Sequence, residues 1–354
     1  MADRDTIIVD TATRIFRDLC DPQTLNSAKD DRWKQPLWDA LEESGLTLTW
    51  VSDEVGGAGA GLFDGFDVLR VAGTYAVPLP LSETLLAGWM LEKAGITCPA
   101  GAMTIAPQRG ADRVTIEADG RLSGIALQIP YAGETGHIAA LAYKGDQAHV
   151  ALVPTSECRI TPGHNIALDT QGAVDFAGAV PVACEPVSIS ADDLQMMGAA
   201  ARSVMIAGAL EAAMDISVQY AQERKAFGRN IGGFQAVQHN LSRLACEAAA
   251  ATAASSSAAE AIASSDTLAG DDAMLLEIAS AKIRCGEAAG QGAAIAHQAH
   301  GAIGFTQEHV LHRFTQRLWA WRDDFGSESV WAVRLGESVA RNGADALWPL
   351  VASR

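Results

Sequence analysis

The stretch from Tyr220 to Leu244 constrains the fold more than any other part of this sequence. Apolar residues recur at helical spacing on both sides of it, and a polar corner rich in glycine separates the two runs. Gly228, Gly232 and Gly233 tolerate backbone angles that end helices. Arg224, just before the break, offers a planar set of donors to a phosphate or a carboxylate. The corner therefore fits either an ordinary helical hairpin with a solvated basic turn or a binding site for an anionic ligand.

Length and charge indicate a large globular chain and argue against two classes of binding partner. The chain has 354 residues, enough for two or three domains, and 49% of them are hydrophobic, so a substantial core is expected. The formal net charge is −17. This argues against general nucleic-acid binding, which needs basic surface, and against adsorption to anionic membranes.

The cysteines and the N-terminus predict a cytoplasmic protein. The six cysteines form no CxxC pair and no zinc spacing, which favours buried free thiols in a reducing compartment. The N-terminal run MADRDTIIVDTATRIF has early acids and no long apolar stretch, so we expect no secretory signal. No segment is long and uncharged enough to predict a membrane-spanning helix.

The pattern of the chain changes twice and predicts three parts. Helical periodicity dominates residues 1–100, with runs near 6–20, 36–44 and 63–76. Residues 101–190 hold short alternating apolar runs separated by turn signals, which predicts an antiparallel β domain. Residues 191–354 return to helical periodicity, with candidate helices at 193–222, 235–265, 271–300 and 328–345. Long helices with short connections predict a helical bundle, so the expected fold class is α+β and multidomain.

Two segments resemble the acyl-CoA dehydrogenase family. The first is the pattern YxxxRxxFGxxIxxFQAxQHxLxxL, which spans residues 220–244 in register. The second, QAHGAIGFTQEHVLHR at residues 298–313, is similar to the family's QxxGGxGF segment. The two occur in the family's order and at about its separation. The resemblance implies an N-terminal α-helical domain, a middle antiparallel β-barrel domain and a C-terminal four-helix bundle that carries FAD-binding segments.

The resemblance also implies which residues hold FAD. The arginine of the corner, Arg224, matches one that reaches the pyrophosphate from a neighbouring subunit. A pyrophosphate requires cationic groups that can donate two parallel hydrogen bonds, and the flavin ring requires an apolar pocket. Ala302 stands where the family usually has a second glycine. The implied cofactor residues are Arg224, Phe227, Phe234, Gln235, Gln298, Ala299, His300, Gly301, Ala302 and Ser327.

Histidine spacing requires that a metal site be considered. His297 and His300 are spaced i,i+3, as are His309 and His312, which places each pair on one helical face. No carboxylate stands at a standard ligand spacing, and the resemblance assigns this segment to FAD. The sequence therefore predicts no metal site.

The family's catalytic base is missing from its usual place. The family reaction removes the α-proton of an acyl-CoA thioester while the β-hydride passes to the flavin, and a carboxylate acts as base. The family's Glu-Gly pair falls on Phe325-Gly326, and the position used by another branch falls near Gly198, where there is no acid. Asp324, or its neighbour Asp323, is the candidate base; the pair also fits a solvated acidic pair beside Arg322. The alternative is that the chain has no base.

The resemblance thus leaves two functions open. One is an FAD-dependent acyl-CoA dehydrogenase, with electron-transfer flavoprotein as electron acceptor and assembly as a homo- or hetero-oligomer, a dimer of dimers. The other is a base-lacking structural partner subunit of a heteromeric acyl-CoA dehydrogenase. The β-domain flavin motif is reduced to Ile129-Pro130-Tyr131-Ala132, which suits the second. By analogy with members of mixed assembly, the substrate class is fatty or ring-bearing acyl-CoA thioesters, such as steroid-derived ones.

Overall fold

The computed structural model describes residues 6–265 and 267–352, and these form two compact units. The first comprises the described part of 1–15 together with 32–69 and 78–198, and the second comprises 16–31, 70–77 and 199–354. Residues 1–5, on which the expectation about a secretory signal partly rests, lie outside the described residues. The division into domains at 100 and 190 stays a prediction.

Helices form the chain before residue 100, where helical periodicity predicted them. The last of them is buried from Leu81 to Leu91, a mostly apolar stretch that also buries Ser82, Glu83 and Thr84. Gly95 ends it in a left-handed conformation with φ 65°. The elements are α1 (Thr6–Leu19), α2 (Pro22–Asn26), α3 (Lys34–Glu43), the short turns η1 (Leu46–Leu48) and η2 (Asp53–Val55), α4 (Leu62–Thr74) and α5 (Leu81–Ala94).

Two sheets make up the β region of the first unit. A six-stranded sheet has the order β3-β2-β5-β6-β9, with β1 also paired to β5, and a three-stranded sheet has the order β4-β8-β7. Apolar residues of both sheets, including Ile129, Ile138 and Phe176, form one shared core. The strands are β1 (Met103–Ala106), β2 (Val114–Ile116), β3 (Leu122–Ser123), β4 (Ile125–Pro130), β5 (His137–Lys144), β6 (Gln147–Pro154), β7 (Arg159–His164), β8 (Thr170–Asp175) and β9 (Ala183–Pro186), with the turn η3 (Thr155–Glu157) after β6.

The prediction of a purely antiparallel β domain is wrong for two pairings. Both β1 and β2 run parallel to β5. Strand β1 pairs with residues 137–140 of β5 and β2 pairs with residues 142–143, so the two follow one edge of β5 in succession. The antiparallel partner β6 occupies β5 along its whole length. Over residues 103–186, all of which the structure describes, the strand pairings give two sheets, so the closed barrel is not confirmed.

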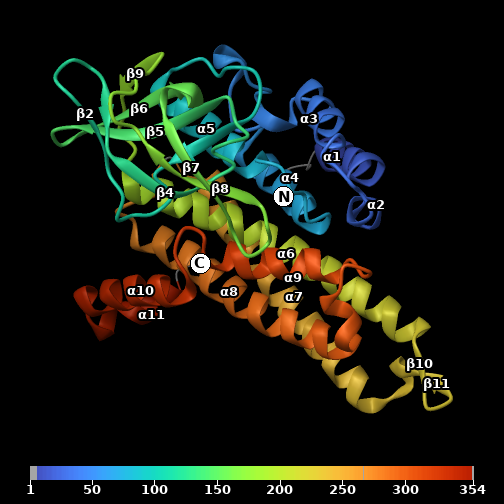
Figure 1. The fold of residues 1–354 in the computed structure, drawn as a ribbon. Coiled ribbons are helices and arrows are strands. Elements are labelled where there is room, and N and C mark those ends of the chain that lie inside the picture. The colour runs from blue at the N-terminus through green and yellow to red at the C-terminus, as the bar shows by residue number, and fades with distance from the viewer. Residues whose placement is uncertain (1–5, 266, 353–354) are drawn as a thin grey trace. The chain divides into compact units, whose positions relative to one another are not determined.

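The helical C-terminal region is confirmed, and it contains more helices than the four predicted. Those four correspond to α6 (Ala191–Glu223), α7 (Gln235–Ala263), α8 (Asp272–His300) and α10 (Glu328–Asn342). The prediction missed α9 (Leu311–Asp323), whose apolar positions are interrupted by charged and polar residues, and α11 (Ala344–Ala352), a short apolar helix that contains Pro349. Within the second unit, Figure 1 shows α7, α8 and α9 side by side, with α10 and α11 packed together.

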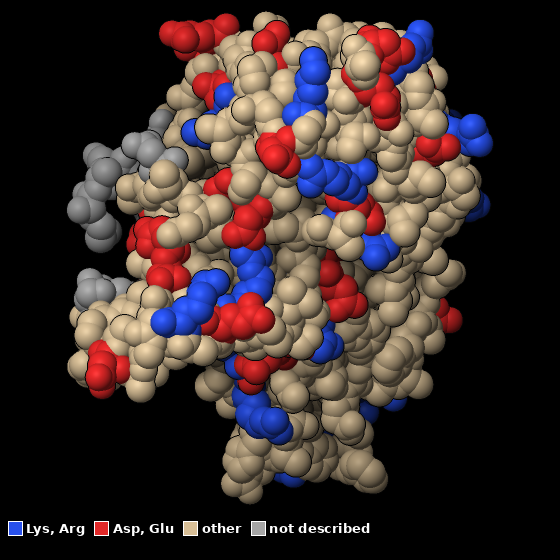
Figure 2. All heavy atoms as spheres, turned by 90° about the vertical axis from the view of Figure 1, so that its left-hand side faces the viewer, with Lys and Arg blue, Asp and Glu red and all other residues tan. Residues whose placement is uncertain are grey.

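The charged surface, the helix lengths and the cysteines can be compared with the expectations from the sequence. Acidic and basic side chains are interspersed on the face shown in Figure 2. Over the described residues, no helix combines the length and apolarity needed to cross a membrane. All six cysteines are free, but only Cys20 and Cys285 are buried and Cys246 is exposed, so the expectation of buried thiols was too broad.

Two glycines allow α4 and α6 to touch backbone to backbone inside the second unit. A Cβ atom on Gly208 would lie 2.1 Å from the carbonyl oxygen of Arg70, and one on Gly73 would lie 2.2 Å from that of Met205. Real Cβ atoms do not approach backbone oxygens so closely, so neither position has room for a side chain. The Arg70 guanidinium lies 3.6 Å from the Glu211 carboxylate beside this crossing.

Gly208→Ala should therefore destabilise the protein by roughly 1–3 kcal/mol, because the added methyl group forces the helices apart. Chemical denaturation monitored by circular dichroism would measure the change. Gly336→Ala is the matched control, since Gly336 also lies inside a helix but a Cβ there meets nothing within 4 Å. The control should be neutral or stabilising by up to about 1 kcal/mol. Equal effects of the two substitutions would contradict the close crossing.

Candidate functional site

The corner between α6 and α7 is a small hairpin. Strands β10 (Lys225–Ala226) and β11 (Arg229–Asn230) pair across a turn, and η4 (Ile231–Gly233) leads into α7. Phe227 and Gly228 occupy the turn with φ of 53° and 80°. The amide of Ile231 donates to the carbonyl of Arg224 at 2.8 Å, which closes the base of the hairpin. Gly228 suits its left-handed conformation, whereas Phe227 adopts one that costs energy for a residue with a side chain.

The hairpin presents aromatic and cationic groups to solvent. The side chain of Phe227 is 95% exposed, and its ring meets that of Phe234 edge to face at 6.2 Å. The Arg229 guanidinium lies over the Phe234 ring, 4.1 Å from its centroid. Arg224 and Gln235 are exposed as well. A strained turn that holds a phenylalanine almost fully in solvent indicates a surface that meets a ligand or another chain.

The second segment lies at the C-terminal end of α8. Helix α8 ends at His300, and Gly301 caps it with φ 68° and ψ −148°, at the start of the turn η5 (Gly301–Phe305). A Cβ on Gly301 would meet no atom within 4 Å, so its backbone borders open space. Gln298, Gly301 and Ala302 are exposed and Ala299 is half-buried, whereas His300 is buried. Of the five predicted cofactor residues in this segment, His300 therefore faces the protein interior and the others are at least partly exposed.

The two segments meet through Tyr220. Its hydroxyl donates to the backbone carbonyl of His300 at 3.4 Å, and the two rings stack with centroids 4.3 Å apart. His309 contacts both rings, at 5.8 Å from Tyr220 and 4.6 Å from His300. Residues separated by 80 positions in the sequence are therefore adjacent. Tyr220 lies four residues before Arg224, and His300 directly precedes Gly301, so the stacked rings lie next to both segments.

The buried histidines are held neutral. Nδ1 of His300 lies 2.8 Å from the carbonyl of Ala296, and since a carbonyl only accepts, Nδ1 carries the proton. Burial lowers the pKa of His300 to about 4, partly offset by that hydrogen bond. Burial also lowers the pKa of His297, which stacks on Phe305 at 3.7 Å, and that of His309. Across the described part of the chain, no group of three or more His, Cys, Asp or Glu side chains is placed to hold a metal ion.

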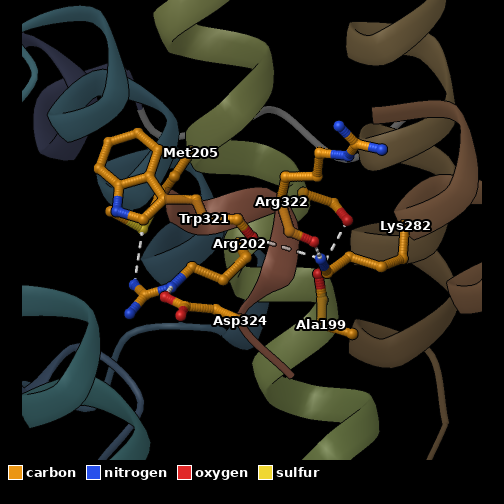
Figure 3. A network of polar contacts seen from close by, with 8 residues as sticks. Ala199, Arg202, Met205, Lys282, Trp321, Arg322 and Asp324 are labelled. Carbon is orange, nitrogen blue, oxygen red and sulfur yellow. Dashed lines mark hydrogen bonds and ion pairs between the residues drawn. The ribbon is translucent and has the colours of Figure 1, made fainter. Parts of the chain in front are cut away.

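Asp324, the candidate base, lies in an ion pair. One of its carboxylate oxygens, Oδ2, accepts from Nε of Arg202 at 2.8 Å, and the Arg202 side chain is only 3% exposed (Figure 3). Phe325 follows with φ 54°, and the indole of Trp331 donates to its carbonyl at 2.9 Å. Asp323 is exposed. The carboxylate that sequence reasoning singled out therefore has a buried partner.

Ser327 lies just beyond this turn, at the start of α10. Its hydroxyl lies 2.9 Å from that of Ser329 and makes no capping bond to the α10 backbone. The Arg322 guanidinium beside it pairs with Glu328, with Nε donating at 3.0 Å. The predicted solvated pair near Arg322 is thus replaced by two separate ion pairs, one for Asp324 and one for Arg322.

Sequence reasoning missed two buried cations near this turn, Arg202 and Lys282. Lys282 has no exposed surface, and its ammonium donates to the carbonyls of Trp321 and Arg322 at 3.3 and 2.6 Å. A signal existed in the sequence. The residues three and four positions before and after Lys282 are apolar or glycine, which places the lysine on a buried helical face.

The exposed residues of the two segments fit FAD. A dinucleotide needs cations for its pyrophosphate, flat apolar surface for its rings and backbone that it can approach closely. The hairpin supplies Arg224, Arg229 and the Phe227–Phe234 pair, and Gly301 supplies a backbone position bordered by open space. These groups provide a basis for binding such a cofactor.

Acidification should destabilise the protein through the buried histidines. Their pKa values are lower in the folded than in the unfolded chain, so the unfolded state takes up protons first as the pH falls below about 6.5. Stability is then lost progressively between about pH 6.5 and 4. For His300 alone we expect a loss on the order of 1–2 kcal/mol between pH 7 and 5. Urea unfolding of the wild type and of His300→Phe would measure it, and an equally steep pH dependence in the variant would contradict the assignment.

Comparison with known proteins finds similarity in the region that contains both segments, 220–244 and 298–313. Residues 193–328 match the family model for the acyl-CoA dehydrogenase C-terminal domain. Acyl-CoA dehydrogenase IpdE2 of Mycobacterium tuberculosis is 26% identical over 292 residues, which cover 82% of each chain.

Among solved structures, the ChsE4–ChsE5 complex of Mycobacterium tuberculosis matches with a TM-score of 0.84 and 21% identity, over 97% of this chain and 100% of that one. A variant of the Tcur3481–Tcur3483 steroid ACAD matches with a TM-score of 0.81 and 22% identity, over 95% and 98%. At these identities the structural likeness shows the fold alone. Residues 193–328 therefore match an acyl-CoA dehydrogenase C-terminal domain, and the chain as a whole is similar to relatives named acyl-CoA dehydrogenases, which are oxidoreductases that act on CH–CH groups.

Proposed function

We propose that the chain is an FAD-dependent acyl-CoA dehydrogenase that introduces a double bond between the α- and β-carbons of an acyl-CoA thioester. One observation carries this proposal: the Tyr220–His300 contact joins the hairpin of Arg224 to the glycine-capped end of α8. Both segments resemble FAD-binding segments, and their adjacency allows one cofactor to contact both. FAD, when bound, supplies the acceptor for the substrate's β-hydride.

The chain's own residues would hold the cofactor in two ways. The exposed guanidinium of Arg224 is available to a pyrophosphate bound on a neighbouring protomer, because nothing on its own hairpin buries it. Phe227 and Phe234 provide apolar surface, and Gln235 begins α7 beside them. Gly301 and Ala302, with Gln298 and Ala299, let the backbone approach the adenosine part, while buried His300 positions the segment. Ser327 offers a hydroxyl from the start of α10.

This arrangement requires an oligomer, and we propose a homo- or hetero-oligomer built as a dimer of dimers. Electron-transfer flavoprotein is the proposed electron acceptor, and the cytoplasm is the proposed location. One structural neighbour is named a steroid ACAD, which supports a ring-bearing acyl group as the substrate class. Fatty acyl-CoA thioesters are the alternative class.

Arg224→Ala should abolish or strongly reduce FAD content, because the pyrophosphate loses a bidentate cationic partner. The measurement is the visible flavin spectrum of purified protein, expressed per protein chain. Arg243→Ala is the matched control, since Arg243 is an exposed arginine on α7 beyond the corner. Wild type and control should both be yellow and bleach anaerobically with a suitable acyl-CoA. Full flavin content in Arg224→Ala would refute the role of this residue.

Asp324 is the proposed base in this reaction. Its carboxylate would take the α-proton, and Arg202 would fix the side chain through Oδ2. That same contact favours a second candidate function. A carboxylate bound to a buried guanidinium is held in place as a structural anion, and proton uptake would leave Arg202 without its counter-charge. We therefore retain, as the second candidate, a base-lacking partner subunit that completes an active site in a heteromeric acyl-CoA dehydrogenase.

Replacement of the carboxylate separates the two candidates. If Asp324 is the base, Asp324→Asn should lower kcat by about 10²–10⁴-fold while FAD content stays constant. Asp323→Asn is the control, because Asp323 is exposed and adjacent. If the chain is a partner subunit, the wild type alone should be inactive, and a complex with an unlike chain should be equally active with either residue at 324. Native mass measured on the same samples reports the assembly.

A further inference from the structure

Lys282 is a buried lysine whose ammonium lies at the C-terminal end of α9. Its side chain extends from the middle of α8 and donates to the carbonyls of Trp321 and Arg322 at 3.3 and 2.6 Å. Figure 3 shows the amine pointing toward the last turn of α9, on the other side of that turn from Arg202. No part of the Lys282 side chain is exposed. Burial of a charged amine is costly, so this placement requires a compensating role.

The end of α9 needs the donors that Lys282 supplies. The last carbonyls of any helix lack partners within the helix. Helix α9 ends at Asp323, and its C-cap residue Asp324 is extended, with φ −62° and ψ 138°, rather than a left-handed glycine. A cation at this position also suits the negative end of the helix dipole. The ammonium therefore replaces the cap that the local sequence does not provide.

Three helices hold the turn that follows. Lys282 of α8 fixes the carbonyls before it, Arg202 of α6 binds the carboxylate of Asp324, and Trp331 of α10 donates to the carbonyl of Phe325. Phe325 has φ 54°, which costs energy for a residue with a side chain, and persists only where its surroundings hold it. The first and third of these contacts fix the backbone on either side of Asp324.

We propose that Lys282 is a positioning residue: its ammonium fixes the C-terminal turn of α9 and thereby the places of Asp324 and Ser327. The importance of placing Asp324 and Ser327 rests on the proposed function. The contact by which Lys282 holds the turn, called the brace below, does not depend on that function. Lys282 touches neither substrate nor cofactor in this role and acts through the backbone carbonyls alone.

Charges around the amine determine its response to pH. Burial lowers the pKa of Lys282 to about 8, while the negative charge of Asp324 raises it. Asp323 on α9 also raises it, and Arg202 on α6 lowers it. On α10, Glu328 pairs with Arg322, which lowers the pKa of that carboxyl. Burial raises the pKa of Cys285 to about 12, so the thiol stays neutral near pH 8.

The sign of the pH effect follows from linkage. If the turn opens and the amine reaches solvent, its pKa returns to 10.5, above the value of about 8 in the closed turn. The open form then binds more protons between about pH 8 and 10.5, so raising the pH through this window disfavours opening. Opening of the turn should fall roughly 30-fold between pH 7 and 9.5. A brace made of apolar contacts alone would give no such change.

Hydrogen–deuterium exchange of peptides covering residues 321–331 tests the proposal on the protein as purified. In Lys282→Met the carbonyls of Trp321 and Arg322 lose their donor, and opening should rise roughly tenfold or more in these peptides. Lys282→Gln keeps an N–H donor without the charge and should restore part of the protection. Lys93→Met is the control, because Lys93 is an exposed lysine in the last turn of α5. After correction for intrinsic rates, the pH effect should appear in wild type and control and vanish in both Lys282 variants.

Two results would overturn the proposal: wild-type protection in Lys282→Met, or pH-independent opening of the turn in the wild type. If Lys282→Met does not fold, the wild-type pH series and Lys282→Gln still decide the matter. Flavin content is measured on the same samples. A colourless protein that shows the expected exchange behaviour would refute FAD binding and leave the brace intact.

Discussion

Close packing of α8 against its neighbours is the constraint on which the second unit depends. A Cβ on Gly292 would lie 2.5 Å from a methyl of Leu210 on α6 and 3.2 Å from one of Leu244 on α7. Most buried positions of α8 are alanine or glycine, which allows three helices to approach the same segment. The polar side chains among the larger buried residues of α8, Lys282, His297 and His300, each have a hydrogen-bond partner.

Helix α8 links the two regions that the proposed function uses. Its C-terminal end carries His300 against Tyr220, and Lys282 lies about 27 Å earlier along the helix. His300 and Lys282 are both buried, and each donates to a backbone carbonyl, so each fixes a main-chain segment. One rigid helix therefore sets the positions of the glycine cap at 301 and of the turn at 324, although these serve different parts of the proposed chemistry.

The Arg202–Asp324 ion pair separates the two candidate functions. Both require the cofactor corner, and they differ in what the carboxylate at 324 does. A buried ion pair contributes little net stability, because desolvation offsets most of the attraction, but loss of one member leaves a costly charge. An anion held in this way is well suited to fix a turn and less suited to exchange protons. Whether a base acts from this chain or from another thus depends on one contact between residues 122 positions apart.

The sequence by itself determined the local structure: helical runs near 6–20 and at 235–265, alternating strands in the middle region, and the glycine corner after Tyr220. These follow from periodicity and from backbone preferences, which act over a few residues. It also indicated the resemblance to the acyl-CoA dehydrogenase family, through two short segments. Only the tertiary structure decided that β1 and β2 run parallel to β5, that Tyr220 stacks on His300, and that Arg202 and Lys282 are buried beside Asp324. Periodicity shows which face of a helix is buried, but which distant residue meets that face depends on how all the helices pack together.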